Sequence, residues 1–110
     1  MPRPSFVRIG VVTCIATDDF TGSDTLVAQL GGDRVFIGDF VAEDSRDVGV
    51  EASIAPGITE LTILEQDLTG DDELITIDLT KDMDVDRTVG VLVGDARYDI
   101  SFKVISEPDP

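Results

Sequence analysis

The chain of 110 residues has the length of one domain and carries a net charge of −15, from 23 acidic and 8 basic residues. A field of this sign opposes binding to phosphate backbones, so we expect no nucleic-acid partner. No apolar run approaches the roughly 18 residues of a membrane-spanning helix, and the start of the chain lacks secretory-signal features, which predicts a cytoplasmic protein or part of a particle assembled there.

Short segments rich in Val, Ile, Leu and Thr follow one another along the chain, each bounded by Gly, Asp or Pro. They predict strands at residues 6–16, 25–30, 33–41, 48–54, 59–66, 73–79, 88–94 and 97–104. The last segment alternates most clearly, with every second residue from Tyr98 to Val104 expected to face a core. About eight strands at this spacing predict one antiparallel β-sandwich spanning residues 1–110, with a core over about residues 6–105 and short Pro-containing tails.

Cys14 is the single cysteine and lies in an apolar strand, where we expect a small buried hydrophobe. The chain has no His and no Trp, and it offers no partner for a Ser-based triad, so we expect no enzyme. The missing imidazole and thiolate ligands also disfavour zinc and copper.

Acids cluster in three connections, at residues 17–24, 42–47 and 67–72. If the strands alternate in direction, these connections emerge at the same end of the sandwich. Converging carboxylates on flexible loops suit Ca²⁺, which takes six to eight oxygen ligands. A fourth acidic segment, residues 82–86, has the alternating Asp of an EF-hand loop without its Gly or flanking helices, so we interpret it as a solvated loop at the opposite end.

Two of the loops resemble those of calcium-binding C2 domains. In that family a first loop places two Asp six residues apart and ends in Gly-Ser-Asp, as Asp18 and Asp24 do here. A later loop carries acids at i, i+2 and i+8 ahead of two apolar residues, as Glu65, Asp67 and Glu73 do. The resemblance implies a C2-like sandwich over about residues 6 to 105, with a topology that starts one strand later in the family's circular order.

The resemblance also implies calcium ligands at these five acids, although Thr25 and Thr76 replace the Pro and Gly common in the family. Further candidate ligands are Asp19, Asp44, Asp71 and Asp72. Phe20 occupies the place of an apolar loop tip. The alternative is that the loops are ordinary turns whose acids serve solubility, and the overall acidity also suits a protein adapted to high salt or encoded by a GC-rich genome.

Together these features predict a non-enzymatic calcium-binding C2-like module in protein interaction or assembly, with Ca²⁺ bridging two or three acidic loops. The expected partner is a protein, either a second copy or a larger assembly. Two alternatives stay open: a structural or decoration subunit of a viral or injection-type particle, and a calcium-dependent membrane-docking module with Phe20 at its tip. Net charge disfavours docking, because anionic lipids attract clustered Lys or Arg and the Arg residues here are scattered.

Overall fold

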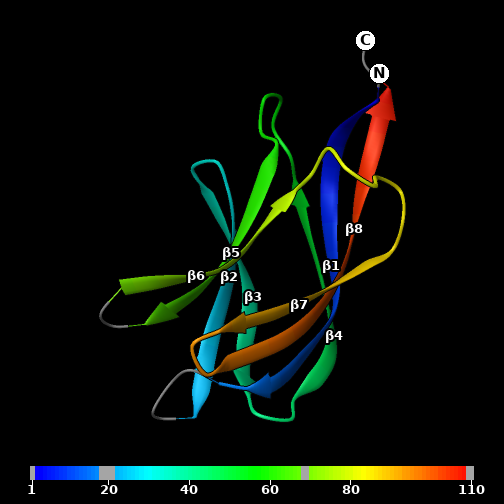
Figure 1. Cartoon of the computed structure of the whole chain (residues 1–110). Coiled ribbons are helices and arrows are strands. Elements are labelled where there is room, and N and C mark those ends of the chain that lie inside the picture. Colours follow the sequence, from blue (N-terminus) through cyan, green and yellow to red (C-terminus); the bar gives the residue numbers. More distant parts are fainter. Residues whose placement is uncertain (1, 18–21, 68–69, 109–110) are drawn as a thin grey trace.

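The computed structural model describes residues 2–17, 22–67 and 70–108, with residue 67 described by its backbone alone. Eight strands run through these ranges, and Figure 1 labels them in chain order. Their bounds are Pro2–Ala16 (β1), Ser23–Leu30 (β2), Asp33–Val41 (β3), Ser45–Ser53 (β4), Glu60–Asp67 (β5), Gly70–Asp78 (β6), Arg87–Val93 (β7) and Ala96–Pro108 (β8). No helix in the described ranges is long and apolar enough to cross a membrane.

The strands form two four-stranded sheets that pack against each other (Figure 1). One sheet has the order β4-β1-β8-β7 and the other the order β3-β2-β5-β6. Every pairing between neighbouring strands is antiparallel. The predicted all-β, eight-stranded antiparallel sandwich is therefore confirmed.

The observed strands match the predicted ones in number and order, but several ends differ. β1 and β8 run past the predicted limits because they pair with each other as far as Pro2 opposite Pro108. They form a long ribbon in Figure 1. β2 and β6 begin earlier than predicted, which moves Asp24, Asp71 and Asp72 from the predicted loops into strands.

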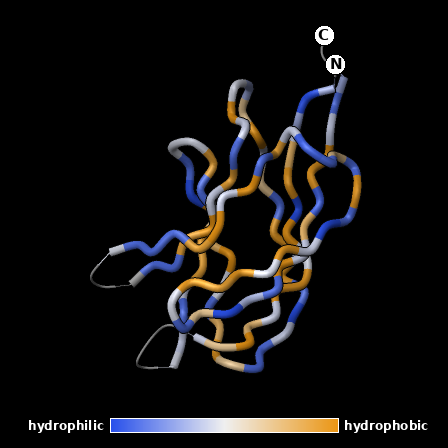
Figure 2. The backbone as a smooth tube through the Cα atoms, viewed as in Figure 1, coloured by the Kyte–Doolittle hydropathy of each residue, from blue (hydrophilic) through white to orange (hydrophobic). Residues whose placement is uncertain are grey.

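Alternation along the strands fills the space between the sheets. The predicted core-facing series of β8 is confirmed, because each alternate residue from Tyr98 to Val104 is at most 3% exposed. Figure 2 shows hydrophobic and hydrophilic positions alternating along the strands. Other fully buried members of this core are Val7, Val12, Leu26, Ala28, Phe40, Leu61 and Ile63. Removing such apolar surface from water is the main force that holds the two sheets together.

One end of the sandwich gathers the β3–β4 turn with the end of β1, the start of β2 and the end of β5, and we call it the loop end. The backbone of Cys14 in β1 exchanges hydrogen bonds of 2.7 Å with Glu43 and Asp44 of the β3–β4 turn. Thr25 of β2 lies opposite both Asp39 of β3 and Gln66 of β5. The end of β1, the start of β2 and the ends of β3 and β5 therefore lie together, as the alternating strand directions predict.

Candidate functional site

Two carboxylates lie buried at the loop end, on neighbouring strands of one sheet. Asp24 in β2 is 1% exposed and Glu65 in β5 is 2% exposed. Glu65 lies directly opposite Leu26, two residues after Asp24, so both acids lie on the side of the sheet that faces the core. Burying an ionised carboxylate is costly unless hydrogen bonds or an opposite charge compensate it. These two acids are therefore placed by the fold, unlike the many exposed acids of the chain.

The phenol of Tyr98 connects Asp24 to the opposite sheet. Its hydroxyl donates a 2.5 Å hydrogen bond to Asp24 Oδ2 across 74 residues of sequence. Burial, together with the Asp24 carboxylate and Cys14, raises the pKa of Tyr98 well above its usual value near 10. Tyr98 therefore stays protonated and acts as the donor. An edge-on contact with Phe40, with ring centroids 6.2 Å apart, fixes the ring between the sheets.

Cys14 lies beside this hydrogen bond and is fully buried, as predicted. Burial raises the pKa of the Cys14 thiol, and the nearby carboxylates of Asp24 and Asp44 act in the same direction against the opposing hydrogen bond with Tyr98. A thiol held neutral in this way is a poor nucleophile and a poor metal ligand. Cys14 therefore serves packing and, through its backbone, the β3–β4 turn.

Asp44, a candidate ligand, shapes that turn. Its Oδ2 accepts a 2.8 Å hydrogen bond from the backbone N–H of Val41 and lies 3.5 Å from an Arg46 guanidinium nitrogen. The same guanidinium packs over the Phe40 ring, with its central carbon 4.3 Å from the ring centroid, and donates to the Asp39 carbonyl. Asp44 is thus held at the loop end by contacts on both sides of the turn.

The acids predicted in the later loop are divided between β5 and β6. Glu73 lies opposite Leu64, and its Oε1 accepts a 2.6 Å hydrogen bond from Thr76 Oγ1. Because side chains alternate along a strand, Glu73 lies on the side of the sheet opposite to that of its neighbour Asp72. Asp72 lies opposite Glu65 in the register of the hairpin, but it is exposed. Of the five primary candidates, Asp24 and Glu65 are the two that the described structure buries on the core side at the loop end.

A third acid of β6, Asp71, pairs with Arg34 of β3 at 2.7 Å. The remaining candidates, Asp18, Asp19 and the loop tip Phe20, lie outside the described residues, as does the side chain of Asp67. The backbone of Asp67 ends β5 opposite Gly70. Among the residues that the structure does describe, no group of three or more His, Cys, Asp or Glu side chains is arranged to hold a metal ion. The full ligand set therefore stays a prediction.

Tyr98 and Arg46 organise this end of the molecule, and no sequence motif indicated this role for either residue. Tyr98 was predicted as a core position of the last strand. No local pattern shows that its hydroxyl reaches Asp24, since the contact depends on how the two sheets stack. One feature of the sequence did indicate such a contact: a Tyr predicted in the core carries a hydroxyl, which needs a hydrogen-bond partner there.

The acidic segment at residues 82–86 has a different environment. Asp84 adopts a φ of 65°, and its carboxylate accepts hydrogen bonds from the backbone N–H and the hydroxyl of Ser106 in β8. These hydrogen bonds lower the pKa of Asp84. Its three Asp residues are exposed, but Asp84 anchors the segment to β8 and Met83 packs against the core, so the solvated loop of the prediction is in part a fixed turn.

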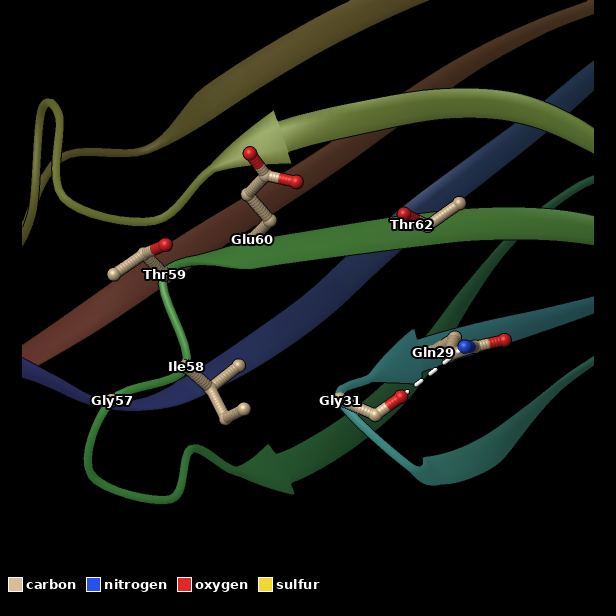
Figure 3. Close-up of a pocket in the computed structure, with 7 residues that line it drawn as sticks. All are labelled: Gln29, Gly31, Gly57, Ile58, Thr59, Glu60 and Thr62. Carbon is tan, nitrogen blue, oxygen red and sulfur yellow. Dashed lines mark hydrogen bonds between the residues drawn. The ribbon is translucent and has the colours of Figure 1, made fainter.

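A shallow hollow of about 280 Å³ lies at the end opposite to the loop end, beside the β2–β3 turn (Figure 3). It sits between the Gly31-Gly32 turn, where Gly31 has a φ of 60°, and the segment that leads into β5. The Ile58 side chain points toward Gly31, and a Cβ there would lie 2.8 Å from Ile58 Cδ1. Glu60 is the one ionisable side chain in its lining, so it offers little to orient a ligand.

Comparisons with known proteins bear on the fold. No family model matches the chain, and no curated protein matches it significantly. A structure of the paired C2 domains, A and B, of extended-synaptotagmin 2 is similar with a TM-score of 0.55 and 19% identity, covering 94% of this chain and 42% of that one. Human GIVD cytosolic phospholipase A2, in complex with methyl gamma-linolenyl fluorophosphonate inhibitor and terbium chloride, gives a TM-score of 0.50 and 15% identity, covering 99% of this chain and 19% of that one.

This chain therefore spans less than half the length of either neighbour. At such low identities the likeness concerns the fold alone. The molecule is a C2-like β-sandwich.

Proposed function

We propose that this chain is a non-enzymatic, calcium-binding C2-like module that acts in protein interaction or assembly. Calcium would be held at the loop end by Asp24 and Glu65 together with acids of the β1–β2 and β5–β6 connections. The observation that carries the proposal is the burial of two carboxylates, at 1% and 2% exposure, on neighbouring strands at that end.

The C2-like fold and the spacing of the acids support the same location. The resemblance to calcium-binding C2 domains predicts ligands at Asp24 and Glu65 from two separate loop motifs, and the fold puts both residues on one face at one end. Asp24 Oδ2 accepts the Tyr98 hydrogen bond, and because a carboxylate has about four lone-pair sites, a carboxylate that accepts such a bond can also coordinate a cation. Oxygen ligands from side chains and turns are the type that Ca²⁺ prefers.

Bound calcium would connect parts of the chain that are distant in sequence. The β1–β2 and β5–β6 connections are joined through β2 and β5, and Tyr98 extends the connection to the second sheet. Calcium binding would therefore add to folding stability. At a free concentration of 100 times Kd, one site contributes about 2.7 kcal/mol. For a domain of this size that raises Tm by roughly 10 °C.

The first test is thermal unfolding in EDTA and then in a millimolar calcium series, at low and at high monovalent salt. The native chain should show a calcium-dependent rise in Tm at both salt levels. The double variant Asp24→Asn with Asp67→Asn should lose the rise, whereas Asp86→Asn, which removes an exposed acid at the opposite end, should keep it. No rise in the native chain would contradict the proposal and leave the acids as a solvated surface.

A second test uses terbium as a probe for the same site. Tyr98 is the single tyrosine, and the chain has no Trp, so sensitised Tb³⁺ luminescence can come only from this ring or from the weaker Phe residues. An ion held by Asp24 would lie within a few ångströms of the phenol that donates to that carboxylate. We expect luminescence that calcium competes away and that Tyr98→Phe strongly reduces. Luminescence that persists in the Asp24→Asn, Asp67→Asn variant would place the ion elsewhere.

A further inference from the structure

The four edge strands of the sandwich differ in charge. β3 and β6 bound one sheet, and β4 and β7 bound the other. β3, β4 and β6 each carry at least two acids, whereas β7 carries none, and Arg87 at its start is its one charged residue. β7 also contains no Pro and no Lys. Charged residues and Pro are the usual means by which proteins prevent an edge strand from pairing with another chain.

The regularity of pairing separates β7 from the other edges as well. The pairs β1–β4, β2–β3 and β5–β6 each contain a register shift, whereas β7 pairs with β8 from Arg87 to Val93 without one. A bulge twists an edge and interrupts its row of free backbone groups. The outer edge of β7 is therefore the straightest template for an added strand.

A comparison of β7 with β4 sharpens this point, because both contain Val-Gly-Val. In β4 the central Gly49 has a φ of 57°, and the triplet is flanked by Asp47 and Glu51 at matching distances. Two copies of β4 paired antiparallel about Gly49 would set Asp47 of one opposite Glu51 of the other, which is repulsive. The triplet of β7 is centred on Gly90 and flanked by uncharged residues.

Leu92 in β7 is 64% exposed, and no other large hydrophobic residue in the described ranges is more so. With Ile15, which is 50% exposed, it lines a shallow hollow of about 230 Å³ on the outer side of the sheet. An exposed apolar edge in such an acidic chain indicates an interface.

We propose that β7 is a homodimerisation edge, at which β7 of a second copy pairs antiparallel about Gly90 to join two four-stranded sheets into one. Val89 of one copy then lies opposite Val91 of the other, and Thr88 opposite Leu92. The partner is a second copy because β7 is self-complementary in that register. At the other three edge strands, acidic side chains would repel another copy of this acidic chain. The inference goes beyond the proposed function, since the pairing requires no calcium.

Charges near the edge permit this arrangement. The two Arg87 residues lie at opposite ends of the paired strands, roughly 20 Å apart at about 3.4 Å per residue. Asp99, opposite Gly90 in β8, lies one strand inward, so the two copies of Asp99 are about 14 Å apart at some 4.8 Å per strand. Both separations exceed the Debye length of about 8 Å at physiological ionic strength.

The test is sedimentation equilibrium of the 110-residue chain in EDTA at physiological salt, over a wide concentration range. The native chain should form a dimer. The variant T88K/L92K sets two lysines opposite each other at both ends of the pairing and should weaken dimerisation at least tenfold. Phe36→Lys removes a residue of similar exposure, 59%, from the β3 edge and should leave the dimer unchanged.

Charge reversal tests the register independently of any loss of folding. T88E/L92E alone should be monomeric, and mixing it with T88K/L92K should restore a heterodimer. A native chain that stays monomeric throughout the range would overturn the inference, as would a dimer that survives T88K/L92K but is lost in Phe36→Lys. Because EDTA is present throughout, neither result depends on whether the calcium site exists.

Discussion

Two acidic regions at opposite ends of the sandwich use the same residue type in opposite surroundings. At the loop end, Asp24 and Glu65 are buried on the core side of central strands. At the other end, Asp82, Asp84 and Asp86 lie exposed in the connection between β6 and β7. In sequence the second region is the more regular acidic motif. The comparison shows that the position of an acid in the sheets, rather than its density in the sequence, decides what the acid does.

Two exposed acids near this end accept hydrogen bonds from Ser or Thr residues beside them. Asp84 accepts two hydrogen bonds from Ser106, and Asp78 accepts two from Thr80. Hydrogen bonds from these neighbours lower the pKa of both carboxyl groups. The buried Asp24 instead joins two sheets through Tyr98. The first kind of contact fixes a turn, and the second fixes the packing of the whole sandwich.

The largest expected effect comes from removing the buried acid. Asp24→Ala leaves the Tyr98 hydroxyl buried without this acceptor, which costs about 1–3 kcal/mol, and it also removes packing atoms from the core. We expect a loss of about 2–4 kcal/mol in the free energy of unfolding. Urea denaturation in EDTA measures it without a contribution from calcium.

Asp86→Ala is the matched control at the other end and should leave the urea midpoint unchanged, because the residue is exposed. Equal losses for the two variants would break the comparison. They would mean that burial at the loop end confers no special role on Asp24.

A smaller effect is expected from the donor side of the same contact. Tyr98→Phe keeps the ring and its edge-on contact with Phe40 but removes the hydrogen bond to Asp24. We expect a loss of about 1–2 kcal/mol, since the carboxylate keeps other interactions. A double-mutant cycle with Asp24→Ala should show that the two losses are not additive. Additive losses would contradict a direct coupling between the sheets through this pair.

Most of the fold could be predicted because its signals are local. Short segments rich in Val, Ile, Leu and Thr, bounded by Gly, Asp or Pro, indicated all eight strands. Strand ends were less accurate where pairing overrides composition. Asp24 was predicted in a loop, yet it continues the ladder opposite Phe40, and β6 starts at Gly70 because the β5–β6 hairpin has a very short connection.

The candidate site was only partly predictable. Loop motifs indicated Asp24 and Glu65, but they could not show that both side chains would be buried, because burial depends on which face of each strand meets the opposite sheet. The same motifs gave Glu73 equal weight, but a register shift changes the phase of β6 relative to β5 between Glu73 and Ile75, which lie opposite Leu64 and Ile63. Contacts such as Tyr98 with Asp24 require the three-dimensional stacking of the sheets.

The smallest expected effect concerns Asp84 and is visible as a pH dependence. Asp84→Asn keeps the residue's tolerance of a positive φ and its backbone hydrogen bond to Val104, but it removes the charge that strengthens the bonds from Ser106. The carboxyl pKa is lowered in the folded state. The contribution of the Asp84 carboxylate to stability is therefore present above the unfolded pKa of about 3.9 and is lost as the pH falls through the folded pKa.

The native chain should thus be slightly more stable than Asp84→Asn at pH 7 and equally stable at the acid limit, measured as Tm from neutral pH to pH 2. A stability difference that does not change with pH would mean that the Ser106 contact does not depend on the charge of Asp84, and the contrast between the two acidic regions would then rest on burial alone.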